Sequence, residues 1–163
     1  MDRARRGDHD ALTALYTEHA EAVYEVAFYL MESSADAQDV VQDVFIGLPE
    51  AIRTYEGRGS FGSWLRTVAV RTALTKLRQR RRLNEISLGF HRRGPSLAPV
   101  GHIDRIELER AVSSLPEKLR IVVVLKEIQG FSHKEIAALL GIRPTASAAR
   151  LSRAREQLRE KLT

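Results

Sequence analysis

The chain has 163 residues, a length that suits one ordinary domain or two small ones, and it carries a net charge of +5. It contains no cysteine, which excludes disulfides, thiolate metal sites and cysteine nucleophiles. The basic charge favours a polyanionic partner, either nucleic acid or an anionic membrane surface. No window approaches the roughly 18 apolar residues of a membrane span, and the first residues are charged. We therefore predict a cytoplasmic protein that has no membrane partner.

Three helices are predicted in the first half. The first covers residues 11–31, where apolar side chains recur at steps of three and four; His19 lies on this stripe and is expected to be a partly buried structural histidine. The second runs to about Tyr55 after an N-cap at Ser33 or Ser34. Pro49 lacks a backbone donor, so we expect a kink or a break near Gly47.

The third helix follows a short loop over residues 56–60 and ends in a basic run. Its predicted inner face consists of Phe61, Trp64, Leu65, Val68, Thr72 and Leu77. Five cations lie within seven residues at its end: Lys76, Arg78, Arg80, Arg81 and Arg82. Aromatic and cationic side chains together suit unstacked single-stranded bases. Phe61 and Trp64 are at core spacing, so Tyr55 is the better candidate for such a contact.

Periodicity disappears over the following segment and returns as four helices. Asp104 and Glu107 have the spacing of a capping box, and Pro116 suits the first turn of the next helix. Residues 121–124 are β-branched, but the proline start and Gly130 favour helix over strand. The sequence therefore predicts an all-α protein. It has two small helical domains, residues 1–83 and 104–163, joined by a flexible linker over residues 84–103.

Residues 132–158 have the pattern of a helix-turn-helix. A capping box at Ser132 and Glu135 opens a short helix, Gly141 permits the left-handed turn, and a longer helix follows. The second helix carries Arg150, Arg153, Arg155 and Arg159. Such a helix fits the major groove of DNA, although an ordinary helical hairpin with a solvated basic face has the same pattern.

At this point the chain resembles the extracytoplasmic-function sigma factors of bacterial RNA polymerase. The segments that carry the resemblance are DAQDVVQDVF at 36–45, FGSWLRTVA at 61–69, LPEKLR at 115–120, GFSHKEIA at 130–137 and RLSRAR at 150–155. They occur in the family's order and cover nearly all of the chain outside the linker. The resemblance implies a factor that binds core RNA polymerase and promoter DNA, first as duplex and then melted. An anti-sigma factor is a further partner typical of the family.

The resemblance also implies roles for individual residues. Asp36, Asp39 and Asp43 share a helix face by spacing, and with Gln42 and Phe45 they would bind core polymerase. The minus-ten element would be contacted by Tyr55, Arg58, Arg71, Thr75, Lys76, Arg78, Arg80 and Arg81. The minus-thirty-five element would be read by Arg120, Ser132, Lys134, Arg143, Thr145, Ser147, Arg150 and Arg153.

The chain departs from the family's pattern at three places. Arg71 and Thr75 stand where an asparagine and an aspartate are usual, so the minus-ten preference is expected to be unusual. The run ASAA at 146–149 replaces a threonine-valine-lysine-serine run. This change puts Ser147 at a buried apolar position and removes a phosphate-reaching lysine at Ala148, which predicts weak minus-thirty-five reading. Pro49 replaces a large residue at the end of the docking helix.

Three other functions remain open at this level. A stand-alone helix-turn-helix regulator explains residues 104–163 but leaves the acidic face unused. An enzyme could bind a hard metal through Asp36, Asp39 and Asp43, but no phosphate loop or nucleophile motif supports catalysis, so neither a metal nor a cofactor is predicted. A degenerate sigma-like protein would bind polymerase or an inhibitor and start transcription poorly.

Overall fold

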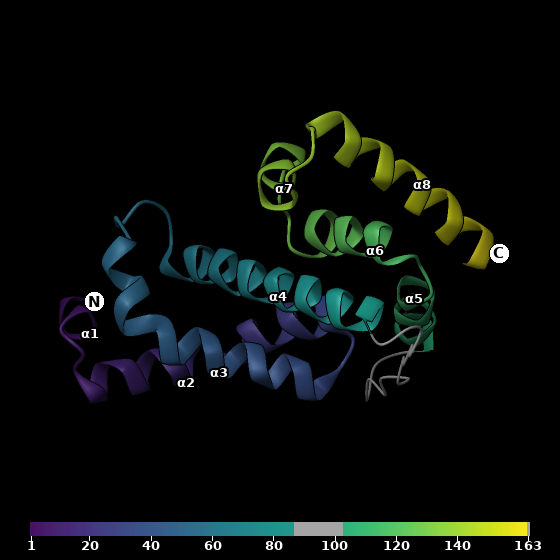
Figure 1. Ribbon diagram of the computed structural model, residues 1–163. Coiled ribbons are helices and arrows are strands. Elements are labelled where there is room, and N and C mark those ends of the chain that lie inside the picture. Colours follow the sequence, from purple (N-terminus) through teal and green to yellow (C-terminus); the bar gives the residue numbers. More distant parts are fainter. Residues whose placement is uncertain (87–102, 163) are drawn as a thin grey trace. The chain divides into compact units, whose positions relative to one another are not determined.

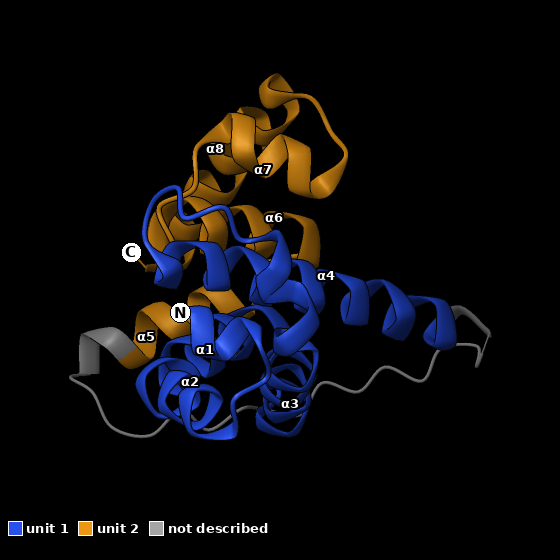
Figure 2. Cartoon of the chain, turned by 90° about the vertical axis from the view of Figure 1, so that its left-hand side faces the viewer, with its two compact units in different colours: residues 1–96 blue, residues 97–163 orange. Residues whose placement is uncertain are grey.

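The computed structural model describes residues 1–86 and 103–162, which are all helix or short connections (Figure 1). The chain divides into two compact units, residues 1–96 and 97–163 (Figure 2). The predictions of an all-α fold and of two helical domains are confirmed. No helix among the described residues is long and apolar enough to cross a membrane.

The described residues of the first unit, 1–86, form four α-helices and one 3₁₀ turn: α1 (Asp2–Arg5), α2 (His9–Met31), α3 (Ser34–Ala51), η1 (Ile52–Thr54) and α4 (Phe61–Ile86). Local caps explain where α2 and α3 begin. The Asp8 carboxylate accepts from the N–H of Ala11 at 3.1 Å, and the Ser33 hydroxyl accepts from the N–H of Asp36 at 3.2 Å. The predicted cap at Ser33 is thus confirmed, whereas α1 has no counterpart among the predicted helices.

Helices α2, α3 and α4 pack against one another and enclose the core of this unit. Buried residues at helical spacing supply it: Val23, Val26, Ala27 and Leu30 from α2, Val40, Val44 and Leu48 from α3, and Leu65, Ala69, Val70, Ala73, Leu74 and Leu77 from α4. The predicted inner face of α4 was partly wrong. Phe61, Trp64, Val68 and Thr72 are only half-buried, because the small residues Ala69 and Ala73 turn a different side of α4 toward its neighbours.

The predicted break near Gly47 does not occur. Helix α3 continues through Pro49 and ends two residues later, at Ala51. A proline removes only its own N–H and obstructs the carbonyl four residues earlier. So close to the end of a helix, this loss affects the last turn and leaves the rest of the helix intact.

The second unit contains α5 (Ile103–Ser113), α6 (Glu117–Val123), the π-helical turn η2 (Val124–Ile128), α7 (His133–Leu140) and α8 (Pro144–Leu162). Pro116 occupies the N-cap position of α6, and residues 121–124 are helical as predicted. Helix α8 packs against α5, α6 and α7. Its inward side chains, Leu151 and Ala154, meet a core that includes Val122, Leu125 and Ile136.

The connection between the units lies mostly outside the described residues, at positions 87–102. Helix α4 extends through residues 84–86, and α5 includes residue 103, so both helices reach into the segment predicted to be linker. The sequence offers no proline or glycine between Gly62 and Gly89, which explains why α4 does not end at residue 83. The side chain of Asp104, predicted to cap α5, lies outside the described residues.

Candidate functional site

The predicted polymerase-binding residues lie on α3, and two of them already have partners within the unit. The Asp43 carboxylate lies 2.7 Å from the Nζ of Lys76, and the Asp36 carboxylate accepts from the Nη1 of Arg80 at 2.9 Å. The same Nη1 donates to the carbonyl of Met31 at 3.2 Å. These contacts join α3 to α4, so residues predicted for polymerase binding and for DNA binding neutralise one another.

The remaining polymerase-binding candidates are presented outward. Asp39 and Gln42 are exposed. Phe45 is half-buried, and its ring lies edge-on to Tyr16 with centroids 5.0 Å apart. Ile46, the next residue on α3, is 77 % exposed. The outer side of α3 is therefore a mixed acidic and apolar surface.

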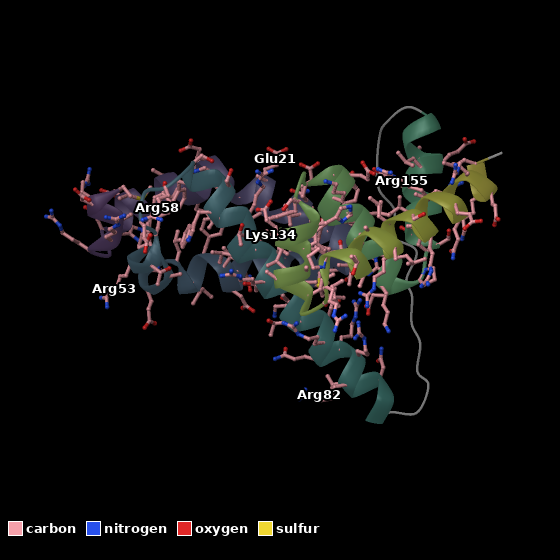
Figure 3. The ribbon with its side chains drawn as sticks, turned by 90° about the horizontal axis from the view of Figure 1, so that it is seen from above. Glu21, Arg53, Arg58, Arg82, Lys134 and Arg155 are labelled. Atoms are coloured by element: carbon pink, nitrogen blue, oxygen red, sulfur yellow. The ribbon has the colours of Figure 1, made fainter. Side chains whose placement is uncertain are left out.

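The predicted DNA-binding residues of α4 form two groups. Arg71, Thr75 and Arg78 are exposed and follow one another at steps of four and three, so they form an outward stripe along the helix. The Thr75 hydroxyl donates to the carbonyl of Arg71 at 2.9 Å and lies 3.4 Å from the Arg78 guanidinium. Arg82 continues this stripe at the far end of α4 (Figure 3). Lys76 and Arg80 instead face α3, and Arg81 is exposed.

The loop before α4, residues 55–60, carries an aromatic cluster at its base. The Tyr55 ring lies 5.5 Å from Phe61 and 5.3 Å from Trp64, and its hydroxyl donates to the carbonyl of Gly59 at 3.1 Å. All three rings are half-buried. Arg58 is 89 % exposed on the loop, and Figure 3 shows it with Arg53 at the opposite end of α4 from Arg82.

A pocket of about 300 Å³ adjoins this loop, between α2 and the first turns of α4. His19 lines it, together with Ser60, Ser63 and Arg66. The His19 ring meets Phe61 edge-on at 5.2 Å, and 18 % of its side chain is exposed, so the histidine is partly buried as predicted. The wall therefore combines aromatic, hydroxyl and cationic groups within one concave surface.

The helix-turn-helix is formed by α7, Gly141 and α8. The Ser132 hydroxyl accepts from the N–H of Glu135 at 3.1 Å, and the Glu135 carboxylate accepts from the N–H of Ser132 at 3.0 Å. The hydrogen bond from the Ser132 backbone N–H to the carboxylate, and secondly the Ser132 side chain beside it, lower the pKa of Glu135 below its ordinary value. Gly141 ends α7 with φ +68°, a conformation in which an added side chain would be strained. The predicted capping box and left-handed turn are confirmed.

Two residues predicted to read the minus-thirty-five element are buried in this unit, so their side chains do not lie on its surface. Ser147 is fully buried, and its hydroxyl lies 2.8 Å from the Nδ1 of His133 on α7. Arg120 is only 4 % exposed within α6. Ser147 faces inward because it occupies the apolar position of the motif, where a hydrogen bond to histidine satisfies its hydroxyl.

The other candidates of this unit are accessible. Lys134 lies on the outer side of α7 (Figure 3), Arg143 and Thr145 are exposed where α8 begins, Arg153 is exposed on α8, and Arg150 is half-buried. Ser132 is half-buried within the capping box. Arg155 is engaged elsewhere, because its guanidinium donates to the Glu127 carboxylate of η2, with Nε at 3.0 Å. The accessible cations could reach phosphates from both sides of the turn.

The described residues contain no group of three or more acidic or histidine side chains arranged to hold a metal ion. On α3 the two outer aspartates of the proposed triad are instead paired with Lys76 and Arg80. Their carboxylates therefore serve as partners of cations on α4.

Sequence reasoning missed two contributors to these sites. His133 had no distinguishing signal, since its partner lies 14 residues away. Arg5 donates to the carbonyl of Tyr55, 50 residues along the chain, and no local pattern predicts such a contact.

Comparison with known proteins agrees with this organisation. Residues 15–83 match the family described as Sigma-70 region 2, and residues 105–158 match Sigma-70, region 4. The sigma factor CarQ of Myxococcus xanthus is 33 % identical over 99 % of this chain and 95 % of its own length. The ECF sigma-E factor of Escherichia coli K12 is 30 % identical over 99 % of this chain and 92 % of its own length. SigE of Mycolicibacterium smegmatis, also an ECF sigma factor, is 32 % identical over 96 % of this chain, which spans 64 % of that relative.

Two solved structures have the same fold. The sigma factor RpoE of Bartonella quintana, in complex with the anti-sigma factor NepR, aligns with a TM-score of 0.74 at 25 % identity over 92 % of this chain and 95 % of its own. CnrH, in complex with the cytosolic domain of CnrY, aligns with a TM-score of 0.62 at 30 % identity over 99 % of this chain and 93 % of its own. Both halves match sigma regions, and full-length relatives share at least 30 % identity. The chain therefore belongs to the ECF sigma factors of the sigma-70 family, which direct RNA polymerase to promoters.

Proposed function

We propose that this sigma factor starts transcription in the cytoplasm by dividing promoter recognition between its two units, residues 1–83 and 104–163, with residues 84–103 as the linker. It contributes binding surfaces and no catalysis of its own. The observation that carries this proposal is the arrangement around the 55–60 loop. An aromatic cluster, a pocket and the basic helix α4 adjoin one another there.

Core polymerase binds the outer side of α3. Asp39, Gln42 and Asp43 supply polar contacts to basic residues of the polymerase, and Phe45 contributes apolar area at the same surface. Charges at the edge of such an interface steer association and set orientation more than they add affinity. The exposed Ile46 extends the apolar part by one residue, where burial would contribute most of the free energy of binding.

The 55–60 loop captures an unstacked base of the minus-ten element. The pocket of about 300 Å³ is at the lower end of the range for small-ligand sites, about 300–1,000 Å³, and it suits a single base better than a larger ligand. Tyr55 offers a ring for stacking, which contributes about 1–3 kcal/mol per base in single-strand binding proteins. Beyond the pocket, Arg58, Arg71, Thr75, Arg78 and Arg81 line the path of the opened strand along α4, with Lys76 and Arg80 on the side of α3.

The second unit binds the minus-thirty-five element mainly through phosphates. Among the predicted contacts, Lys134, Arg143 and Arg153 are exposed cations, Arg150 is half-buried, and Thr145 is an exposed polar side chain in the first turn of α8. Ala148 and Ala149 are exposed but offer no hydrogen-bonding group to base edges. We therefore propose weak, degenerate reading of this element. Nanomolar, sequence-selective binding to duplex DNA in a gel-shift titration of the full chain would contradict this.

An inhibitory protein is a further proposed partner. RpoE of Bartonella quintana is seen in complex with the anti-sigma factor NepR, and CnrH is seen in complex with the cytosolic domain of CnrY. Their similarity in fold to this chain supports an anti-sigma factor that competes with core polymerase. Loss of co-elution with core polymerase on adding the regulator would be the direct evidence.

The deciding experiment is promoter-dependent transcription with purified bacterial core polymerase, a pool of genomic DNA fragments and RNA sequencing, with and without the protein. Discrete new transcript starts are expected, and the aligned upstream sequences would reveal both promoter elements. If the protein co-elutes with core but produces no new starts, a degenerate sigma-like protein fits better. If it does not co-elute, a stand-alone regulator fits better, although the match of the first half to Sigma-70 region 2 does not favour that function.

A further inference from the structure

The 55–60 loop is fixed at both ends by hydrogen bonds, and one of them comes from Arg5, near the start of the chain. The Tyr55 hydroxyl donates to the carbonyl of Gly59 at 3.1 Å, which closes the loop on itself. The Nη2 of Arg5 donates to the carbonyl of Tyr55 at 2.8 Å, across 50 residues of sequence. Gly57 and Gly59 both have positive φ. Glycine backbone between these two anchors has many accessible conformations, so holding it in one of them costs conformational entropy.

Arg5 is held in place by the short helix α1. Ala4 is buried, and α1 contacts α2, α3 and η1, the turn that leads into the loop. Gly7, with φ +82°, turns the chain back toward α2, and Arg3 forms an ion pair with Asp8 at 3.0 Å across this turn. Helix α1 thus fixes the starting point of the Arg5 side chain beside η1.

The guanidinium of Arg5 is more constrained than an ordinary surface arginine. Its Nε is buried without a hydrogen-bond partner among the described residues, which an arginine free to turn into water would avoid. Its side chain is 37 % exposed, and its nearest carboxylate, that of Asp2, is 3.8 Å away. The central carbon lies 6.0 Å from the centroid of the Tyr55 ring, at the outer limit of a cation–π contact. The contacts to Tyr55 are therefore the main short-range interactions of this cation.

We propose that Arg5 is a positioning residue for promoter opening. It holds the backbone and ring of Tyr55 in the conformation that receives the unstacked minus-ten base, so less conformational entropy is lost when the base enters. Arg5 itself need not touch DNA. This inference rests on the proposed role of the 55–60 loop, and its test must separate the two.

The test uses the reconstituted holoenzyme on a promoter fragment recovered by the RNA-sequencing experiment. Opening is measured by permanganate reactivity of unpaired thymines. Each minus-ten base of the non-template strand is replaced in turn by an abasic site, to find the position whose base is captured. Arg5→Met removes the guanidinium but keeps the apolar stem, and Arg6→Met is the matched control, because Arg6 is exposed on the same segment and the charge change is identical.

We expect Arg5→Met to reduce opening about five- to tenfold on the intact promoter, within the range of one ordinary hydrogen bond because the Arg5 side chain is partly exposed, with Arg6→Met close to the parent. On the sensitive abasic template the two variants should be equal, because no base is left to position. Arg5→Lys keeps a donor and should recover part of the loss. Co-elution with core polymerase should be the same for all variants.

Several outcomes would overturn the inference. If Arg5→Met matches Arg6→Met on the intact promoter while one abasic site still weakens opening, Arg5 has no positioning role although the loop does capture a base. If the Arg5→Met defect persists undiminished on that abasic template, the residue acts through overall folding or charge. If Arg5→Lys recovers nothing, a donor at this position is not what opening requires, and the positioning role fails. If no abasic site weakens opening, the proposed base capture fails, and the inference fails with it.

Discussion

The ion pairs between α3 and α4 predict that the free protein restrains its own binding to single-stranded DNA. Lys76 belongs to the surface proposed for the opened strand, yet its Nζ lies 2.7 Å from the carboxylate of Asp43. The side chains are 26 % and 52 % exposed, so water screens this pair only in part. Asp43→Asn would remove the partner and leave Lys76 available to a phosphate.

The expected size of the effect follows from the exposure of the pair. Partly exposed ion pairs contribute about 0.2–1 kcal/mol, which corresponds to about 1.4- to 5-fold in affinity. Neutralising any nearby acid also weakens repulsion of DNA, so the matched control is Asp39→Asn. Asp39 lies one turn away on α3, is exposed, and undergoes the same charge change. The excess affinity of Asp43→Asn over Asp39→Asn measures the released lysine.

Fluorescence anisotropy with a labelled single-stranded oligonucleotide, titrated at several salt concentrations, is the assay. Each additional phosphate contact steepens the slope of log K against log salt by about 0.7 for single strands. We expect this steepening for Asp43→Asn and not for Asp39→Asn. Equal affinities and equal slopes for the two variants would refute the reasoning, since Lys76 would then be as available beside Asp43 as without it.

Three further predictions concern the second unit. Ser147→Ala leaves the Nδ1 of His133 without its hydrogen bond, and urea denaturation should show a loss of about 1–3 kcal/mol; no loss would mean that the buried hydroxyl is neutral. Glu135 has a pKa below its ordinary value of 4.5, so its ionised carboxylate stabilises the fold above pH 4.5. This stabilisation is lost as the pH falls through the lowered pKa. The stability advantage over Glu135→Gln should therefore shrink in urea titrations between neutral pH and acid, and an advantage that grows there would contradict the assignment. Arg153→Ala should weaken duplex binding and reduce the salt slope by about 0.9, whereas Arg155→Ala, whose charge is paired with Glu127, should change the slope less; the reverse order in filter binding would exclude the proposed phosphate contact.

The coupling between α3 and α4 also bears on how polymerase binding and strand binding are linked. If basic residues of core polymerase engage Asp43, its hold on Lys76 weakens, and Lys76 gains freedom to meet DNA. By reciprocity, DNA bound at Lys76 would favour polymerase at Asp43 to the same extent. The first prediction therefore also sets an upper limit on this coupling, about the fivefold expected for one partly exposed ion pair.

The sequence by itself determined the helices and their order, because the signals involved are local. A cap at Ser33, the reciprocal cap of Ser132 and Glu135, and a glycine at 141 each act within four residues, and apolar spacing reports which elements are amphipathic. The same local motifs, in order, were enough to identify the sigma family. The extent of α4 and the path of α3 through Pro49 were misjudged, since a single breaker or a basic run sets a helix end only weakly.

Only the tertiary structure decided which predicted residues are available for binding. It paired Asp43 with Lys76 and Asp36 with Arg80, turned Ser147 inward onto His133, and brought Arg5 to the carbonyl of Tyr55. Each of these contacts joins residues at least 14 positions apart, so it depends on how two helices rotate and cross. Rotation about a helix axis is fixed by packing, here by small residues such as Ala69 and Ala73, and a local pattern carries no record of the partner it will face.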